Sequence, residues 1–366
     1  MNSFLDYCLA NHDWVLELIE TLVALESPSD DPTAVNRCGA ELATRLHALG
    51  GKITRVESAA AGDHIRAAFG TGSRQLLLLG HFDTVWPIGQ LARMQLKREG
   101  GKLYGPGVFD KKAGIGLAAL ATRALLDRDQ LNDCQVVMLW TTDEEIGSTT
   151  SRGLIEIEAS KSDAVLVFEP SLPGGALKTS RKGVGQFEMI TRGVSAHAGL
   201  EPGKGVSAIR ELARQIIALD DLQDPASGVT LTVGVVSGGT RANVVPAEAR
   251  ATIDARATTR ADADRVQRLM QALQPQVAGA QVEVTGGFDR PPLERTPAVV
   301  ALFEQAKAVA AEIGLRLEEG SAGGGSDGNF PPRSAFQRST ALAQSATVRT
   351  RSTSTSRSTR LFLGQP

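Results

Sequence analysis

Cysteine is scarce in this sequence of 366 residues, which contains only Cys8, Cys38 and Cys134. The three stand far apart and show no C-x-x-C spacing. Neither a disulfide framework nor a thiolate zinc site is therefore expected. We expect all three to be buried, reduced thiols.

Long apolar runs and an excess of one charge are also missing. No stretch approaches the roughly 20 apolar residues that span a bilayer, and residues 1–10 lack the basic and apolar parts of a secretory leader. Lys and Arg number 39 against 41 Asp and Glu, a net charge of −2. This balance gives no field that would gather nucleic acid or an anionic membrane. We expect a cytoplasmic protein that acts on small molecules.

The length and the 42% of hydrophobic residues suffice for two domains. In residues 1–176, helical spacing alternates with short apolar runs, which is typical of an open α/β sheet with strands buried on both faces. The predicted helices are 4–25, 36–49 and 113–126, and the predicted strands are 53–56, 64–69, 76–79, 136–140 and 165–168.

Residues 177–286 show a different pattern of predicted elements, in which strands and helices follow the order of a ferredoxin-like α+β unit. The predicted strands are 184–191, 229–236, 249–253 and 281–284, and the predicted helices are 206–218 and 261–273. A helix at 297–313 returns to α/β texture. We therefore predict that 177–286 is inserted between two parts of one α/β domain, 1–176 and 287–330.

Two motifs follow strands of the first part, where open α/β sheets bind ligands. GHFDTV at 80–85 supplies His81 and Asp83, an imidazole with a carboxylate that can orient it. GPGVFDKKAG at 105–114 supplies Asp110 at the start of a helix, with glycines that let the backbone approach a ligand. Alone, the first is typical of a surface turn and the second of a helix N-cap.

Two further motifs add carboxylates at strand ends. TTDEEIGS at 141–148 contains Asp143, Glu144 and Glu145, and VFEP places Glu169 after another apolar run. An acidic run alone is typical of a solvated face. Together, however, the four motifs bring one imidazole and several carboxylates to one rim of the sheet, a donor set that suits a pair of zinc ions.

In order and wording, these motifs resemble the dizinc metallopeptidase family of carboxypeptidase G, aminoacylase and succinyl-diaminopimelate desuccinylase. The resemblance runs from the N-terminus through GGGSDGNF at 323–330. It implies a zinc-exopeptidase-like α/β domain with an inserted ferredoxin-like dimerisation domain, and two Zn²⁺ as cofactors. Asp110 would bridge both ions, His81 and Glu169 would bind one, and Glu145 the other.

The resemblance also implies catalytic and substrate-binding residues. Glu144 would be the general base and Asp83 the carboxylate behind His81. In the inserted domain, GVSAHAG (193–199) places His197 where dimeric members of the family reach across to the partner's active site. GGTRANVVPAEA (238–249) and DAR (254–256) supply Asn243 and Arg256 for the terminal carboxylate of a small peptide or N-acyl amino acid, and Arg suits that role.

The last 36 residues depart from the family pattern. Residues 331–366 contain 13 Ser or Thr, six Arg and no acid, and the last histidine of the chain is His197. The family's final histidine ligand, to the zinc held by Glu145, is therefore missing, and a closing strand and helix of the catalytic sheet are expected to be absent. A composition shift of this kind indicates a disordered or foreign tail.

A reading-frame shift near Phe330 is one hypothesis for this tail. Codons can be chosen for 331–342 that, in another frame, encode Ala-Ala-Leu-Gly-Ile-Pro-Thr-Leu-Asp-Gly-Leu, the family's expected continuation. Carried through Arg349 and Thr350, the same frame can encode Asp-Gly-Ala-His.

The expected function is hydrolysis of a C-terminal amide bond with release of an amino acid such as glutamate, impaired by the missing histidine. An N-acyl-amino-acid deacylase is the alternative within enzymes. A pseudoenzyme that binds amino-acid carboxylates is the alternative outside them. Retention of both Glu144 and Asp83 argues against the pseudoenzyme, because binding alone needs no base.

Overall fold

The computed structural model describes residues 3–224 and 226–331, together with three short strands at 341–343, 349–351 and 358–360. Two compact units are present. The first comprises 1–179, 295–320 and 330–366, and the second comprises 180–294 and 321–329. The chain thus leaves the first unit and returns to it, and the predicted boundaries at 176/177 and 286/287 stay a prediction.

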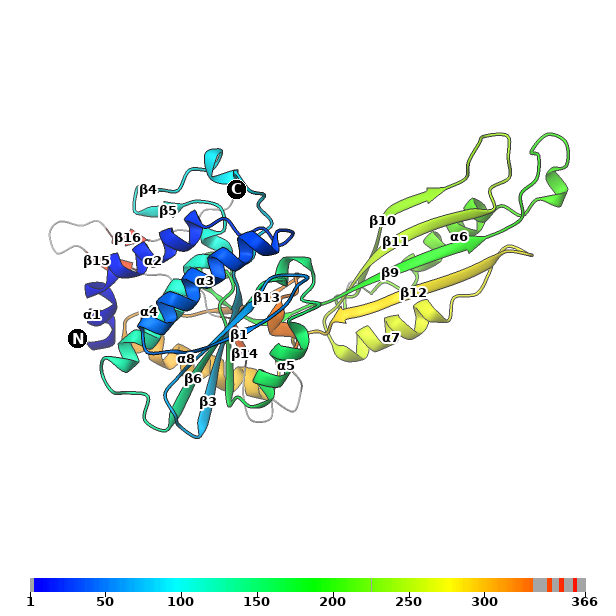
Figure 1. Ribbon diagram of the computed structural model, residues 1–366. Helices are drawn as coiled ribbons and strands as arrows, with labels where there is room; N and C mark the ends of the chain where they lie inside the picture. The colour runs from blue at the N-terminus through cyan, green and yellow to red at the C-terminus, as the bar shows by residue number, and fades with distance from the viewer. Residues whose placement is uncertain (1–2, 225, 332–340, 344–348, 352–357, 361–366) are drawn as a thin grey trace. The chain divides into compact units, whose positions relative to one another are not determined.

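The first unit is built on an eight-stranded mixed sheet with the order β1-β2-β6-β3-β7-β14-β8-β13 (Figure 1). Its strands are β1 Lys52–Val56, β2 His64–Phe69, β3 Arg74–His81, β6 Cys134–Thr141, β7 Ala164–Val167, β8 Leu177–Arg181, β13 Glu319–Ala322 and β14 Ala341–Ala343. Strands β6, β3 and β7 are adjacent and mutually parallel. Their carboxyl ends therefore meet at one edge of the sheet.

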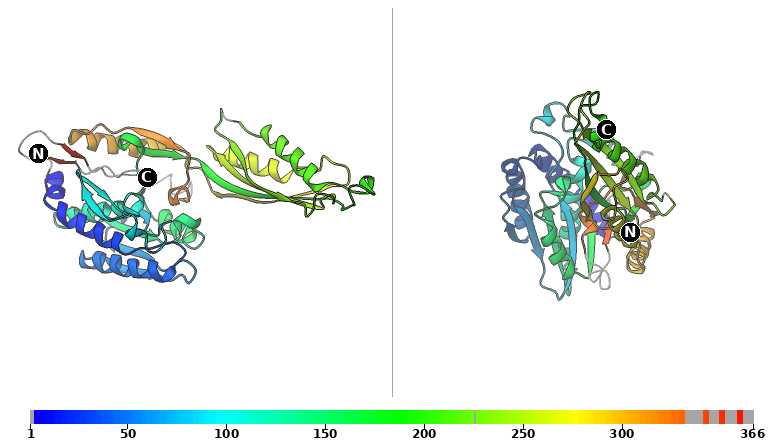
Figure 2. Two further views of the ribbon diagram at one scale, coloured as in Figure 1. Left: turned by 90° about the horizontal axis from the view of Figure 1, so that it is seen from above. Right: turned by 90° about the vertical axis from the view of Figure 1, so that its right-hand side faces the viewer.

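Helices α2, α3 and α4 cover one face of this sheet, and α8 lies on the other (Figures 1 and 2). The unit's helices are α1 Ser3–Ala10, α2 His12–Ala24, α3 Pro32–Ala48, α4 Ala113–Leu126, α5 Arg152–Ser160 and α8 Pro297–Glu312. Hairpins β4 Lys97–Glu99 with β5 Lys102–Tyr104, and β15 Arg349–Arg351 with β16 Ser358–Arg360, lie outside the main sheet. Across the described residues, no helix has the length and apolar content needed to cross a bilayer.

The core of the first unit forms where these helices meet the central strands. Leu18 of α2, Leu42 of α3 and Ala118 of α4 are fully buried against Met138 and Trp140 of β6. Strands β3 and β6 are apolar along both faces, which is typical of central strands covered on each side. The predicted α/β class is confirmed.

Two details differ from the prediction. The helical pattern at 4–25 is broken into α1 and α2 at Asn11, whose side-chain amide donates to the carbonyl oxygen of Tyr7 (2.9 Å). The expectation that the sheet would lack its closing strand is wrong for Ala341–Ala343, since β14 pairs in parallel with β7. This short apolar stretch in a polar tail suits a position between two strands. The predicted loss of a closing helix falls on residues outside the described part of the chain. The frame-shift hypothesis concerns the gene and stays a prediction.

The second unit has the predicted strand-helix-strand-strand-helix-strand order. Its four strands form an antiparallel sheet in the order β10-β11-β9-β12, which is the ferredoxin-like arrangement. The elements are β9 Gly183–Arg192, α6 Ala208–Asp220, β10 Thr230–Gly238, β11 Glu248–Ala257, α7 Arg260–Gln271 and β12 Gln281–Arg290. Its core gathers Phe187, Met189, Leu212, Ile253 and Val266 between the sheet and the two helices.

Removal of the buried Glu211 carboxylate is expected to destabilise this unit. The side chain is fully buried on α6 and accepts hydrogen bonds from the backbone N–H groups of Gln276 (3.0 Å) and Val277 (2.6 Å) and from Gln215 Nε2 (2.7 Å). Glu211→Ala leaves these donors unpaired and is expected to lower the free energy of unfolding by about 2 kcal/mol. Urea unfolding followed by circular dichroism measures the change.

The control is Arg210→Ala, at an exposed position on the same helix. Its unfolding free energy should change by less than about 0.5 kcal/mol. Equal stability of the Glu211→Ala protein and the parent would show that the carboxylate is not an anchor of this unit.

Candidate metal centre

The predicted site residues of the first unit lie at the shared edge of its parallel strands. His81 is the last residue of β3, and Glu144 follows β6 in the short helical turn Glu144–Ile146. Glu169 lies two residues after β7, and Asp110 lies in the turn Val108–Lys112 that leads into α4. The topology therefore brings four separate segments to one place.

Three of these side chains form a compact cluster of potential metal ligands. The ligand atoms of His81, Asp110 and Glu169 all lie within 4.8 Å of one another. His81 Nε2 is 3.4 Å from Asp110 Oδ1 and 3.9 Å from Glu169 Oε1, and Glu144 Oε2 also lies 3.9 Å from this nitrogen. One imidazole and several carboxylates face a common point.

Asp83 is a fully buried carboxylate that supports this cluster from behind. Its Oδ1 is 3.2 Å from His81 Nδ1, which leaves Nε2 of that ring turned toward the cluster. The backbone N–H groups of Glu144 and Glu145 donate to Asp83 at 3.4 and 3.3 Å, and Ser29 Oγ donates at 2.7 Å. One carboxylate thus holds both the imidazole and the acidic turn.

Glu145 lies outside the compact cluster, but the charges of that cluster affect its pKa. Burial raises the pKa of Glu145 to about 7, with further contributions from Asp110, Asp83 and Glu169 against the opposing effect of His81. Burial is the largest cause of this shift, and the neighbouring carboxylates add to it.

Lys111 was not singled out from the sequence, although it stands inside the GPGVFDKKAG motif. Its ammonium is fully buried and donates to Glu169 Oε1 at 2.5 Å. Burial acts to lower the pKa of Lys111, but attraction to Glu169 and Asp110 outweighs it, and the pKa is raised. Burial and Lys111 likewise act to lower the pKa of His81, yet hydrogen bonds to its carboxylate neighbours hold it well above its usual value.

Asp143 anchors the acidic turn from its other side. It is fully buried, and its Oδ2 accepts from the backbone N–H and the hydroxyl of Thr150, both at 2.7 Å. The Thr150 hydroxyl also lies 3.2 Å from Nε2 of His64, a second buried histidine. The sequence showed Asp143 as one of three consecutive acids, and the structure gives it a role in holding the turn.

In the second unit, His197 and Asn243 lie on neighbouring segments. His197 pairs with Val244 in an isolated β-bridge, and the N–H of Ala198 donates to the carbonyl oxygen of Asn243 (3.0 Å). His197 Nδ1 accepts from the backbone N–H groups of Gly199 and Leu200, both at 3.1 Å. Because Nδ1 accepts, the neutral ring of this exposed residue carries its proton on Nε2.

Arg256 lies near the opposite end of β11 from this pair. Strand β11 begins at Glu248, directly after the Asn243 segment, and Arg256 is eight residues further, a run of about 26 Å. The Arg256 guanidinium binds Asp254 in a fork, with Nε–Oδ1 at 2.8 Å and Nη2–Oδ2 at 2.7 Å. Within one chain, Arg256 and Asn243 are thus not brought together.

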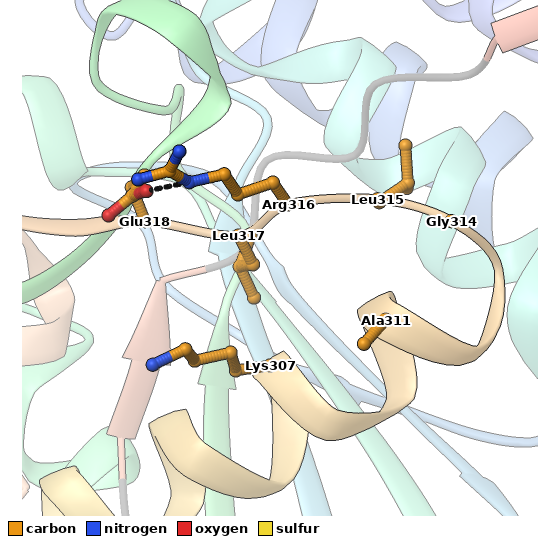
Figure 3. Close-up of a pocket in the computed structure, with 7 residues that line it drawn as sticks. All are labelled: Lys307, Ala311, Gly314, Leu315, Arg316, Leu317 and Glu318. Carbon is orange, nitrogen blue, oxygen red and sulfur yellow. Dashed lines mark hydrogen bonds and ion pairs between the residues drawn. The ribbon is translucent and has the colours of Figure 1, made fainter.

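A pocket of about 520 Å³ elsewhere in the first unit contains none of the predicted site residues (Figure 3). It is lined by the end of α8 and the segment after it: Lys307, Ala311, Gly314, Leu315, Arg316, Leu317 and Glu318. Arg316 and Glu318, two residues apart on the lining segment, form an ion pair at 2.6 Å. The pocket therefore adds no ligand to the carboxylate cluster.

Comparison with known proteins identifies the family. Residues 179–281 match the model of the peptidase dimerisation domain. Carboxypeptidase G2 from Pseudomonas sp. (strain RS-16) is 33% identical over 324 residues, which cover 86% of this chain and 78% of that protein. The chain belongs to the M20 family of metallopeptidases. A succinyl-diaminopimelate desuccinylase from Delftia acidovorans is 27% identical over 86% of both chains.

Solved structures agree on the fold. The aminopeptidase PepT from Bacillus cereus superposes with a TM-score of 0.72 at 20% identity, over 90% of this chain and 89% of that one. An M20 metallo-carboxypeptidase from Sulfolobus solfataricus gives a TM-score of 0.66 at 18% identity, over 90% of each chain. The prediction of a catalytic α/β domain with an inserted dimerisation domain is confirmed.

Membership of the M20 family makes this chain an enzyme that hydrolyses amide bonds and depends on metal ions, typically zinc. The residues present fit such a metal. An imidazole nitrogen and carboxylate oxygens are the donors that zinc takes in hydrolases, and the ring of His81 is already oriented by Asp83.

The pKa of Glu145 predicts a pH dependence of stability for the metal-free M20 chain. Its folded-state value of about 7 exceeds the ordinary 4.5, so the folded state binds an extra proton between these values. The corresponding stability is fully present below the lower value and is lost as pH rises through the upper one. Glu145→Gln cannot titrate, so its free energy of unfolding should fall less than that of the parent between about pH 4.5 and about pH 7.

Urea unfolding in the presence of EDTA at several pH values measures this difference. Glu57→Gln, at an exposed position on the same unit, is the control and should follow the parent. Parallel pH profiles for Glu145→Gln and the parent would contradict the prediction.

Proposed function

We propose that this chain is a zinc-dependent carboxypeptidase of the carboxypeptidase G type, which cleaves a C-terminal amide bond and releases an amino acid such as glutamate. The observation that carries the proposal is the cluster of His81, Asp110 and Glu169 with Glu144 beside it. This cluster occurs in a chain that is 33% identical to Carboxypeptidase G2. It supplies both metal donors and a candidate base at one edge of the sheet.

Two zinc ions are proposed at this edge. Asp110 would be shared between them, with His81 and Glu169 on one ion and Glu145 on the other. When bound, the ions supply Lewis acidity to the scissile carbonyl and to the attacking water. By the family resemblance, the chain lacks a final histidine after His197, and the ion at Glu145 would therefore have fewer protein ligands.

Glu144 moves the proton in the proposed reaction. Its Oε2 lies beside the cluster, and its backbone N–H is held by Asp83. Glu144 takes a proton from the attacking water as that water adds to the amide carbonyl. It then delivers the proton to the nitrogen of the leaving amine, so that an acyl fragment and a free amino acid result.

We propose that His197, Asn243 and Arg256 recognise the substrate in a homodimer formed through the inserted unit. The Nε2–H of the exposed residue His197 is a donor that can stabilise an oxyanion. The Arg256 guanidinium already binds a carboxylate as a fork, the geometry needed for a substrate's terminal carboxylate. Arg256 lies far along β11 from the pair His197 and Asn243. This separation supports a dimer in which the pair acts at one active site and Arg256 of the same chain acts at the other.

An N-acyl-amino-acid deacylase is the second candidate. A deacetylase for acetylornithine from Myxococcus xanthus is 30% identical over 227 residues, which cover 58% of this chain and 57% of that protein. The desuccinylase relative spans more of the chain at lower identity. Both reactions use the same proposed metal residues, so substrate preference distinguishes them.

Glu144→Gln is expected to lower kcat by at least about a hundredfold, because the amide cannot accept the proton of the attacking water. The assay measures amino-acid release by the zinc-loaded protein from aromatic N-acyl-glutamates and from N-acetyl and N-succinyl amino acids. Faster hydrolysis of the aromatic N-acyl-glutamates supports the carboxypeptidase over the deacylase. Glu156→Gln, at a partly exposed position on α5 outside the metal centre, is the control and should keep the parent's rate. Undiminished turnover by Glu144→Gln at equal zinc content would rule out Glu144 as the base.

Residues 331–366 lack the family's final histidine ligand, which predicts weak binding of metal ions. This protein is expected to retain about one zinc, and a version whose residues from 331 onward are translated in the other frame about two. Mass spectrometry of the purified proteins measures the zinc content. Two tightly held zinc ions in the protein with its present tail would show that another residue replaces the missing histidine.

A further inference from the structure

A buried lysine lies among the carboxylates of the proposed metal centre. The side chain of Lys111 is 0% exposed, and its Nζ is 2.5 Å from Glu169 Oε1. After Glu169, the carboxylates of Asp110 and Glu144 make the next largest electrostatic contributions that raise the pKa of Lys111. The ammonium thus neutralises part of the negative charge that would otherwise attract a cation.

The aliphatic part of the Lys111 side chain packs beside two glycines. A Cβ at Gly80 would come within 3.2 Å of Lys111 Cδ and 2.7 Å of Trp140 Cζ3. A Cβ at Gly114 would lie 3.7 Å from Lys111 Cγ. These two glycines leave room for the aliphatic stem, so the ammonium is held at Glu169 rather than free to swing into solvent.

Lys111 and a metal ion compete for the same oxygen. Glu169 Oε1, which accepts from Lys111, is also the carboxylate oxygen of Glu169 that lies 3.9 Å from His81 Nε2. A cation held between His81, Asp110 and Glu169 would share this oxygen with a second positive charge. In a buried setting, that repulsion is screened only weakly.

We propose that Lys111 is a positioning residue that holds Glu169 in place and weakens the affinity of the His81–Asp110–Glu169 cluster for divalent cations. The inference rests on the metal centre of the proposed function. In the metal-free chain, the ammonium compensates the buried carboxylate and stabilises the fold. When zinc binds, the same ammonium opposes it, so the metal is held less tightly and exchanges more readily.

Lys111→Met tests the proposal, because it keeps an unbranched apolar side chain that is only one atom shorter and removes the charge. Zinc affinity of the full chain is measured by competition with a chromophoric chelator, and thermal unfolding is recorded with and without zinc. The Kd for zinc is expected to fall by at least about tenfold. The metal-free variant should unfold at a lower temperature than the metal-free parent. Addition of zinc should raise the unfolding temperature of the variant more than that of the parent.

Lys111→Gln is a second uncharged variant in case the methionine protein fails to fold, and Lys52→Met, at an exposed position on β1, is the control. An unchanged or weaker zinc affinity in the uncharged variants, with stability lowered equally in both states, would assign Lys111 a purely structural role and overturn this inference alone. Absence of zinc from the parent and all variants would overturn the metal centre as well.

Discussion

The buried carboxylate of Asp83 is the interaction on which the site depends. It orients the imidazole of His81 and accepts from the backbone N–H groups of Glu144 and Glu145, while Ser29 fixes it from the other side. Burying a carboxylate is costly unless it is fully hydrogen-bonded. Asp83 satisfies that condition only while β3 and the acidic turn after β6 keep their places. The fold and the geometry of the candidate metal centre are therefore coupled through one side chain.

Electrostatics gives this edge of the sheet its chemical character. Several carboxylates are gathered at the ends of three parallel strands, and burial raises the pKa of Glu145 to about 7. The side chains that compensate this negative charge are His81 and the buried Lys111. Preorganised charges of this kind suit a hydrolase, because the donors are in place before substrate and metal arrive. A bound metal ion would depend on the same Glu169 oxygen that accepts from Lys111.

Much of this arrangement could be predicted from the sequence. Buried parallel strands read as continuous apolar runs, and the motifs after them placed His81, Asp110 and Glu169 at one rim. Residue patterns alone did not separate Glu144 from Glu145; only the family resemblance assigned them different roles. The structure places Glu144 beside His81, in a turn whose backbone N–H groups donate to Asp83. Nor could the sequence show the contact of Lys111 with Glu169, since 58 residues separate them along the chain. Asn11, which ends the first helical pattern, acts through a local bond that apolar spacing does not reveal.

The central claim is that His81, Asp110 and Glu169 hold a catalytic metal ion. Anomalous diffraction at the zinc absorption edge, from crystals of this chain grown with zinc, tests it most directly. The account predicts an anomalous peak within about 2.0–2.2 Å of His81 Nε2 and of carboxylate oxygens of Asp110 and Glu169. Zinc bound at other positions, with no peak at this cluster, would contradict the account.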